Sequence, residues 1–176
     1  MRNKIVAILV LFLVGTGGVS AQKFCFVDTD YILAQSPAYQ SAQTELNTLS
    51  VQWQKEVEAK YAEIDLMYKN FQQEQILMTE ELRVKREAEI VQKEKDAKEF
   101  QKSKFGVDGE LFKKRQELIK PIQDQVYTAV KQMAENGGYQ IVFDKASDMT
   151  MLYTNPKYDK SDAVLDILGW KKGSNK

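Results

Sequence analysis

Histidine, the side chain that most often moves protons near neutral pH, is absent from this sequence of 176 residues. Its absence excludes Ser-His-Asp and Cys-His catalytic arrangements and nearly all zinc sites. No GxxxxGK[ST] loop occurs, so nothing indicates nucleotide hydrolysis. The 25 Asp and Glu residues lie among 25 Lys and Arg at helical spacing, which is typical of a solvated helix face. We therefore expect no enzyme, no cofactor and no metal site.

The single cysteine, Cys25, lies in a short apolar run, "FCFV", at residues 24–27. One cysteine cannot form an internal disulfide. A thiol in apolar surroundings behaves as a small hydrophobic side chain. We therefore expect Cys25 to be buried and to serve packing rather than reactivity.

The first 21 residues have the three-part layout of a secretory signal peptide. Arg2 and Lys4 precede an apolar run over 5–14, and small residues follow up to Ala21. The apolar run is shorter than a membrane-spanning helix requires. Cleavage before Gln22 would leave 23 basic and 25 acidic residues, so the exported chain is slightly acidic. A retained membrane anchor is the alternative to cleavage.

A long helix is predicted from Pro37 to about Ile76. Ser36 suits the N-cap and Pro37 the first helical position, and no Gly or Pro interrupts the segment. A helix of this length reaches about 60 Å, too long for the interior of a small domain, so it must project. Its apolar residues recur every three or four positions and form one stripe, at Leu46, Leu49, Trp53, Val57, Tyr61, Ile64, Tyr68 and Phe71.

A second helical region follows the first. Thr79 can cap a new helix, because its hydroxyl can accept a hydrogen bond from the first turn. Gly106 and Gly109 indicate a local break within 105–112. The helical pattern then resumes and ends near Gly137, a natural C-cap.

Short β-strands are predicted near both ends of the chain, at about 23–28, 139–144 and 149–154, with a short C-terminal helix over 162–169, capped by Ser161 or Asp162. The last two strands suit a hairpin, which is marginal alone in water. We expect the N-terminal strand to join them. The helical segment between must then go out and return, with its tip near 75–82.

The predicted fold class is α+β, with a small β-rich body and a long protruding helical hairpin arm. The body comprises residues 22–36 and 113–176, and the arm comprises residues 37–112. A body of this size offers few apolar side chains, and oligomerisation is a common remedy. We expect strands from several copies to share one core.

Three stretches together resemble the Skp/OmpH family of periplasmic chaperones. They are "VDTDYILAQSPAYQSAQTEL", "KKRQELIKPIQDQVYTAVKQMAENGGYQIVFDKA" and "YDKSDAVLDIL". The resemblance implies a homotrimer whose β-rich body holds three helical arms around a cavity. It also implies a periplasmic holdase that binds unfolded outer-membrane proteins without ATP and prevents their aggregation. The body positions that match are Phe24, Phe26, Ile141, Val142, Phe143, Leu152 and Tyr153.

This chain departs from the family in charge. The well-known members are strongly basic, whereas this exported chain is slightly acidic. We therefore assign no lipopolysaccharide-binding residues, and contact with a membrane surface stays open. No nucleic acid partner is expected.

The arm residues expected to contact clients are flexible or aromatic: Trp53, Met67, Tyr68, Phe71 and Met78. The competing interpretation is that the apolar stripe forms the seam between the two helices of the hairpin. Only apolar residues outside that seam would then be available to clients. A second functional hypothesis is a structural coiled-coil adaptor of the cell envelope, with one defined partner.

Overall fold

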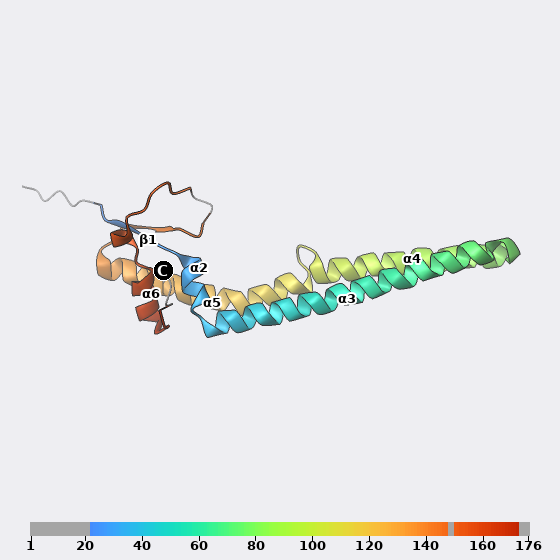
Figure 1. The fold of residues 1–176 in the computed structure, drawn as a ribbon, viewed down its shortest axis with the longest axis horizontal. Coiled ribbons are helices and arrows are strands. Elements are labelled where there is room, and N and C mark those ends of the chain that lie inside the picture. Colours follow the sequence, from blue (N-terminus) through green and yellow to red (C-terminus); the bar gives the residue numbers. More distant parts are fainter. Residues whose placement is uncertain (1–21, 148–149, 173–176) are drawn as a thin grey trace, which may run out of the picture.

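The computed structural model describes residues 22–147 and 150–172. The predicted signal peptide, residues 1–21, lies outside this part of the chain, as does Met149 of the predicted strand 149–154. A small body lies at one end, and long helices run from it to a distant tip and back (Figure 1). Within the described residues, no helix is both long and apolar enough to cross a membrane.

The body contains a two-stranded parallel sheet formed by segments from the two ends of the chain. β1 (Phe24–Val27) pairs with β2 (Ile141–Asp144), with Phe24 opposite Ile141 and Val27 opposite Asp144. This pairing satisfies backbone groups that an isolated strand would leave open. The prediction that the N-terminal strand joins the segment near 141 is confirmed. The whole arm is therefore the crossover connection between two parallel strands.

The two faces of this sheet differ. Side chains alternate along a strand, and residues paired in register share a face. Cys25, Val27 and Val142 therefore point to the side covered by helices, where they pack in the core of the body. We call the opposite side the outer face, and it carries Phe24, Phe26, Ile141 and Phe143.

Three helices cover the inner face: α2 (Thr29–Ala34), α6 (Ser161–Leu168) and the C-terminal part of α5 (Glu110–Gly137). Their fully buried side chains include Ile32 and Leu165.

Glycines end two of these helices. Gly138 and Gly169 follow α5 and α6 with φ of 65° and 68°, where glycine is strongly favoured. The predicted C-cap at Gly137 was one residue early.

The predicted cap of α6 at Ser161 or Asp162 is wrong: both residues lie in the first turn of the helix, and Lys160 is the N-cap. The Ser161 hydroxyl instead accepts from the Asp28 N–H at 2.9 Å and donates to the Asp159 carboxylate at 2.6 Å.

Cys25 is completely buried, so the prediction of a packing role is confirmed. Burial disfavours the thiolate and raises the pKa of Cys25, with the charge of Lys160 opposing this effect. The thiol is therefore a poor nucleophile at neutral pH.

The predicted strand 149–154 is not formed by residues 150–154, and the body is not β-rich. Hydrogen bonds at the end of β2 explain the difference. The Lys145 N–H donates to the Val27 carbonyl at 2.7 Å, and the Thr29 hydroxyl donates to the Asp144 carboxylate at 2.7 Å. They hold the chain against the end of β1, so it does not turn back along β2. The segment after β2 instead loops out from the body (Figure 1).

The chain then returns to the sheet through η2 (Pro156–Tyr158), after which Asp159 forms a bridge with Phe26 of β1.

The arm begins with α3 (Pro37–Glu74), a helix of 38 residues. Its length is about 57 Å at 1.5 Å per residue. The Ser36 hydroxyl accepts a hydrogen bond from the Tyr39 N–H at 3.2 Å, which confirms the predicted N-cap.

The chain reverses at η1 (Gln75–Leu77) and returns as α4 (Glu80–Phe105). The predicted cap of this second helix is confirmed, since the Thr79 hydroxyl accepts from the Leu82 N–H at 3.3 Å. Residues 106–109 separate α4 from α5, which confirms the predicted break, and Figure 1 shows them as a loop projecting from the arm. We call residues 106–109 the joint.

Candidate functional site

Part of the predicted client-binding set lies in the seam between the two helices of the arm. Trp53 is only 8% exposed. Its ring lies edge-on to Phe105, with 6.4 Å between centroids, and the Lys104 ammonium lies 5.0 Å from the centroid of the Trp53 ring. The structure therefore places Trp53 inside the seam beside the joint.

Farther out, Ile64 of α3 packs against Ile90 and Ala97 of α4. Met67 and Phe71 lie against this cluster and remain half-exposed. These two residues thus support the seam with one side and face solvent with the other.

Tyr68 and Met78 lie at the margin of the seam. Tyr68 is exposed, and its hydrogen bond to Glu94 on the opposite helix raises the pKa of the phenol. Met78 is half-buried beside the reversal. The five predicted client residues are therefore not one patch: Trp53 is buried, and the other four lie along the outer part of the arm.

The tip carries the apolar surface that sequence reasoning missed. Ile76 and Leu77 are 88% and 90% exposed. Both lie in η1, between the end of α3 and the Thr79 cap of α4. The sequence did contain a signal for this surface, namely two apolar residues inside the predicted turn. Side chains in such a turn point away from both helices and cannot be buried in the seam.

The joint interrupts one side of the arm while α3 continues on the other. Gly109 is buried, whereas Val107 projects into solvent. Across the joint, the ammonium of Lys104 lies 2.6 Å from the carboxylate of Glu110. The Lys104 side chain is largely buried, so a cation occupies a seam position here.

An ion pair also links the two helices in the middle of the arm. The Lys93 ammonium donates to the Glu63 carboxylate at 2.7 Å. This hydrogen bond is the main reason that the pKa of Glu63 is lowered and the pKa of Lys93 is raised.

The outer face of the body is a second exposed apolar surface. The rings of Phe24 and Tyr158 stack at 5.6 Å, and Phe24 lies edge-on to Phe143 at 6.5 Å. Phe24 and Ile141 are nevertheless exposed, whereas Phe26 is buried. A cavity of about 380 Å³ lies beside these rings, and Met151 and Tyr153 contribute to its wall.

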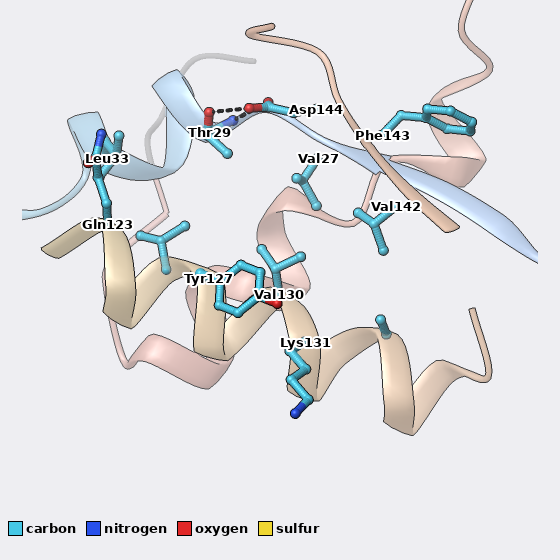
Figure 2. A pocket seen from close by; sticks show the side chains of 12 residues that line it. Val27, Thr29, Leu33, Gln123, Tyr127, Val130, Lys131, Val142, Phe143 and Asp144 are labelled. Carbon is cyan, nitrogen blue, oxygen red and sulfur yellow. Dashed lines mark hydrogen bonds between the residues drawn. The ribbon is translucent and has the colours of Figure 1, made fainter. Parts of the chain in front are cut away.

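The remaining predicted assembly residues fall in two places. Leu152 and Tyr153 project from the segment after β2 and are 96% and 82% exposed. Val142 lies on the inner face instead, where it lines a groove between β2 and α5 (Figure 2). Six of the seven positions thus belong to the outer face or to the projecting segment.

Comparisons with known proteins agree with this architecture. The profile of the family described as "Outer membrane protein (OmpH-like)" matches residues 23–168. An uncharacterized protein of Aquifex aeolicus (strain VF5) is 29% identical over 145 residues, which cover 82% of this chain and 85% of that protein. A crystal structure of a "putative outer membrane chaperone (OmpH-like)" from Caulobacter crescentus CB15 shares the fold, with a TM-score of 0.63, 17% identity and 88% coverage of each chain. Because the family profile spans most of its length, the chain belongs to the OmpH-like, or Skp, family of outer membrane chaperones.

Proposed function

We propose that this protein is an ATP-independent periplasmic holdase that binds unfolded outer-membrane proteins and prevents their aggregation. Membership of the OmpH-like family supports the class of function. The observation that carries the proposal is the exposed apolar surface at the end of a long arm, with Ile76 and Leu77 at the tip. A leader over residues 1–21 would export the chain to the periplasm.

Client contacts belong to the outer part of the arm. Met67, Tyr68, Phe71 and Met78, with the tip pair, offer flexible and aromatic groups that can adapt to many sequences. Each contact is small, so no single site traps the client. Several arms acting together supply the affinity by avidity. Trp53 contributes by holding the seam.

Self-assembly brings those arms together, and we propose a homotrimer joined through the body. A two-stranded sheet with an apolar outer face is undersized as an independent core. Packing the outer faces of three copies would bury Phe24 and Ile141, which are exposed in one chain. The arms would then leave the shared body in one group and enclose a cavity.

The test uses the chain from Gln22 and a denatured outer-membrane barrel protein. We expect one trimer to suppress light scattering when the client is diluted from urea, with no nucleotide present. Scattering that is unchanged at equal molar amounts would contradict the proposal. Binding of one folded envelope protein, with no preference for denatured clients, would instead support the adaptor function.

A matched pair of variants assigns the effect to the tip. The double substitution Ile76→Ser and Leu77→Ser should weaken suppression several-fold. Val107→Ser removes an equally exposed aliphatic side chain at the joint and should change little. Equal effects of both changes would argue that the tip has no special role in client binding.

A further inference from the structure

The tip of the arm is acidic as well as apolar. Residues 72–82 include three acidic residues, Glu74, Glu80 and Glu81, and no basic residue. All three side chains are exposed. Glu80 forms an ion pair with Arg83, but the carboxylates of Glu74 and Glu81 form no hydrogen bond or ion pair with any residue that the structure describes. The tip therefore carries negative charge beside its exposed apolar pair.

Helix dipoles explain two of these carboxylates but not the third. Glu80 and Glu81 lie in the first turn of α4, where the partial positive charge of a helix N-terminus stabilises them. Glu74 is the last residue of α3, where the partial charge is negative, and the last turn of α3 contains no basic residue. The Glu74 carboxylate is therefore uncompensated within the chain, and a cation from a partner would stabilise it.

A small hollow lies at the outer end of the arm, away from the body (Figure 1), and we call it the tip hollow. Its volume is about 160 Å³, and its apolar walls are formed by Met67, Phe71, Met78 and Ile90. An apolar cavity of about 150 Å³ is large enough to bind benzene, so the tip hollow has room for one aromatic ring. The methionine side chains can adjust to that ring, and their sulfur atoms make favourable contacts with ring edges.

The charged residues that line the tip hollow give it a negative sign. Glu74 lines the hollow and has no ion-pair partner among the described residues. Arg86 also lines it, but the Arg86 guanidinium is paired with the Glu89 carboxylate at 3.0 Å. A ring in the hollow would therefore lie beside one uncompensated carboxylate.

We propose that the tip hollow binds an aromatic side chain of an unfolded client, and that Glu74 pairs with a lysine or arginine next to that side chain in the client sequence. The preferred client segments are extended stretches in which aromatic and basic residues are neighbours, and acidic stretches are disfavoured. Ile76 and Leu77 contact apolar residues farther along the same segment. This selection rests on the holdase function proposed above, and it names the client sequences that the tip prefers.

Methyl NMR of the chain from Gln22, with isotope-labelled methionine methyl groups, tests the proposal. The probes are three peptides of equal length, GSKFKSG, GSEFESG and GSKSKSG, which differ only in the charge or in the ring. Met67 and Met78 report on the tip hollow. Met133 is buried in the body and serves as the internal reference.

We expect GSKFKSG to shift the Met67 and Met78 signals and to leave the Met133 signal unchanged. It should bind about five-fold more tightly than GSEFESG, because the change of charge replaces a weak exposed attraction by a repulsion. GSKSKSG lacks the ring and should cause no shift at the same concentration. Equal binding of GSKFKSG and GSEFESG, or no shift of Met67 and Met78 with any peptide, would overturn the proposal.

Charge-changing variants assign the preference to Glu74. Glu74→Gln should reduce the preference for GSKFKSG to about two-fold, and Glu74→Lys should reverse it. The matched control is Glu87→Gln, which removes an exposed carboxylate of α4 outside the tip hollow and should leave the preference unchanged. A preference for GSKFKSG that persists in Glu74→Lys would overturn the role of Glu74.

The aggregation test described above separates this selection from the holdase function. If the chain suppresses aggregation of a denatured barrel protein but does not discriminate between the peptides, only the sequence preference is overturned. If the peptides bind as expected but aggregation is not suppressed, the holdase function is overturned and the tip hollow remains a peptide-binding site.

Discussion

The body and the arm bury their apolar side chains in different ways. In the body, a sheet and three helices surround residues such as Ile32 and Leu165, which have no exposed surface. In the outer arm, the buried residue Ile90 belongs to a cluster of only three buried residues, formed with Ile64 of the facing helix and Ala97, and its neighbour Val91 is exposed. We therefore expect the body to unfold as a cooperative unit and the arm to be held together by many small local contributions.

The largest expected effect tests the body. Leu165→Ala should lower the free energy of unfolding by about 4 kcal/mol, because it leaves a cavity in a site enclosed on all sides. Urea unfolding followed by circular dichroism measures the loss. The matched control is Ile167→Ala on the same helix, where the side chain is exposed. Similar losses for both variants would remove the distinction between an enclosed core and a surface helix.

The corresponding change in the arm should cost less and stay local. Ile90→Ala removes a buried side chain from the seam, but the two helices can close part of the cavity, so we expect about 2 kcal/mol. Hydrogen exchange should accelerate in α4 and the facing part of α3 and stay unchanged in α6. Val91→Ala, the exposed neighbour, provides the control. Faster exchange throughout the body would show that arm and body unfold together.

The third expected effect concerns the joint and is smaller than the effects of Leu165→Ala and Ile90→Ala. A Cβ on Gly109 would lie 2.8 Å from the Lys104 carbonyl oxygen and 2.9 Å from the Gly106 nitrogen. Gly109→Ala should therefore force the loop to shift and cost about 1–2 kcal/mol. Exchange at the Gly109 N–H, which donates to the Gly106 carbonyl at 2.9 Å, reports the change. The control is Val107→Ala, which should leave that exchange rate unchanged. If Gly109→Ala also left it unchanged, the close approach of Gly109 to the backbone of Lys104 and Gly106 would not require glycine.

Local chemistry explains what could be predicted from the sequence. Ser36 and Thr79 were identified as caps because capping depends on a few neighbouring residues. The break at the joint followed from Gly106 and Gly109, two glycines three positions apart. The pairing of β1 with β2 was predicted because an unpaired strand is costly and few strand segments were available.

Contacts between distant parts of the chain explain what could not be predicted from the sequence. Residues 150–154 have the composition of a strand, but hydrogen bonds of Asp144 and Lys145 to residues more than a hundred positions away decide their course. Periodicity placed Trp53 and Tyr68 on one stripe, but the position of the returning helix buries the first and exposes the second. The buried position of Lys104 depends on the same register between the helices.

The smallest expected effect concerns the ion pair that joins the two helices of the arm. The pKa of Glu63 is lowered from its ordinary value of 4.5, so its contribution to stability is complete above that pH and is lost as the pH falls through the folded-state value. The pKa of Lys93 is raised from 10.5, so its contribution is complete below that pH and is lost as the pH rises through the folded-state value. Between these limits the pair stabilises the arm only slightly, because both groups are exposed and salt screens them.

Glu63→Gln should therefore shift the urea midpoint slightly downward at pH 7 and low salt. The shift should vanish in 1 M salt, where screening is strong, and at pH 3, to the extent that Glu63 of the unsubstituted chain is then protonated. Glu99→Gln removes a partner within one helix and joins nothing across the seam, so it should shift the midpoint less. A shift that persists in high salt would mean that Glu63 acts through packing, and the arm would then resemble the body more closely than its exposed seam indicates.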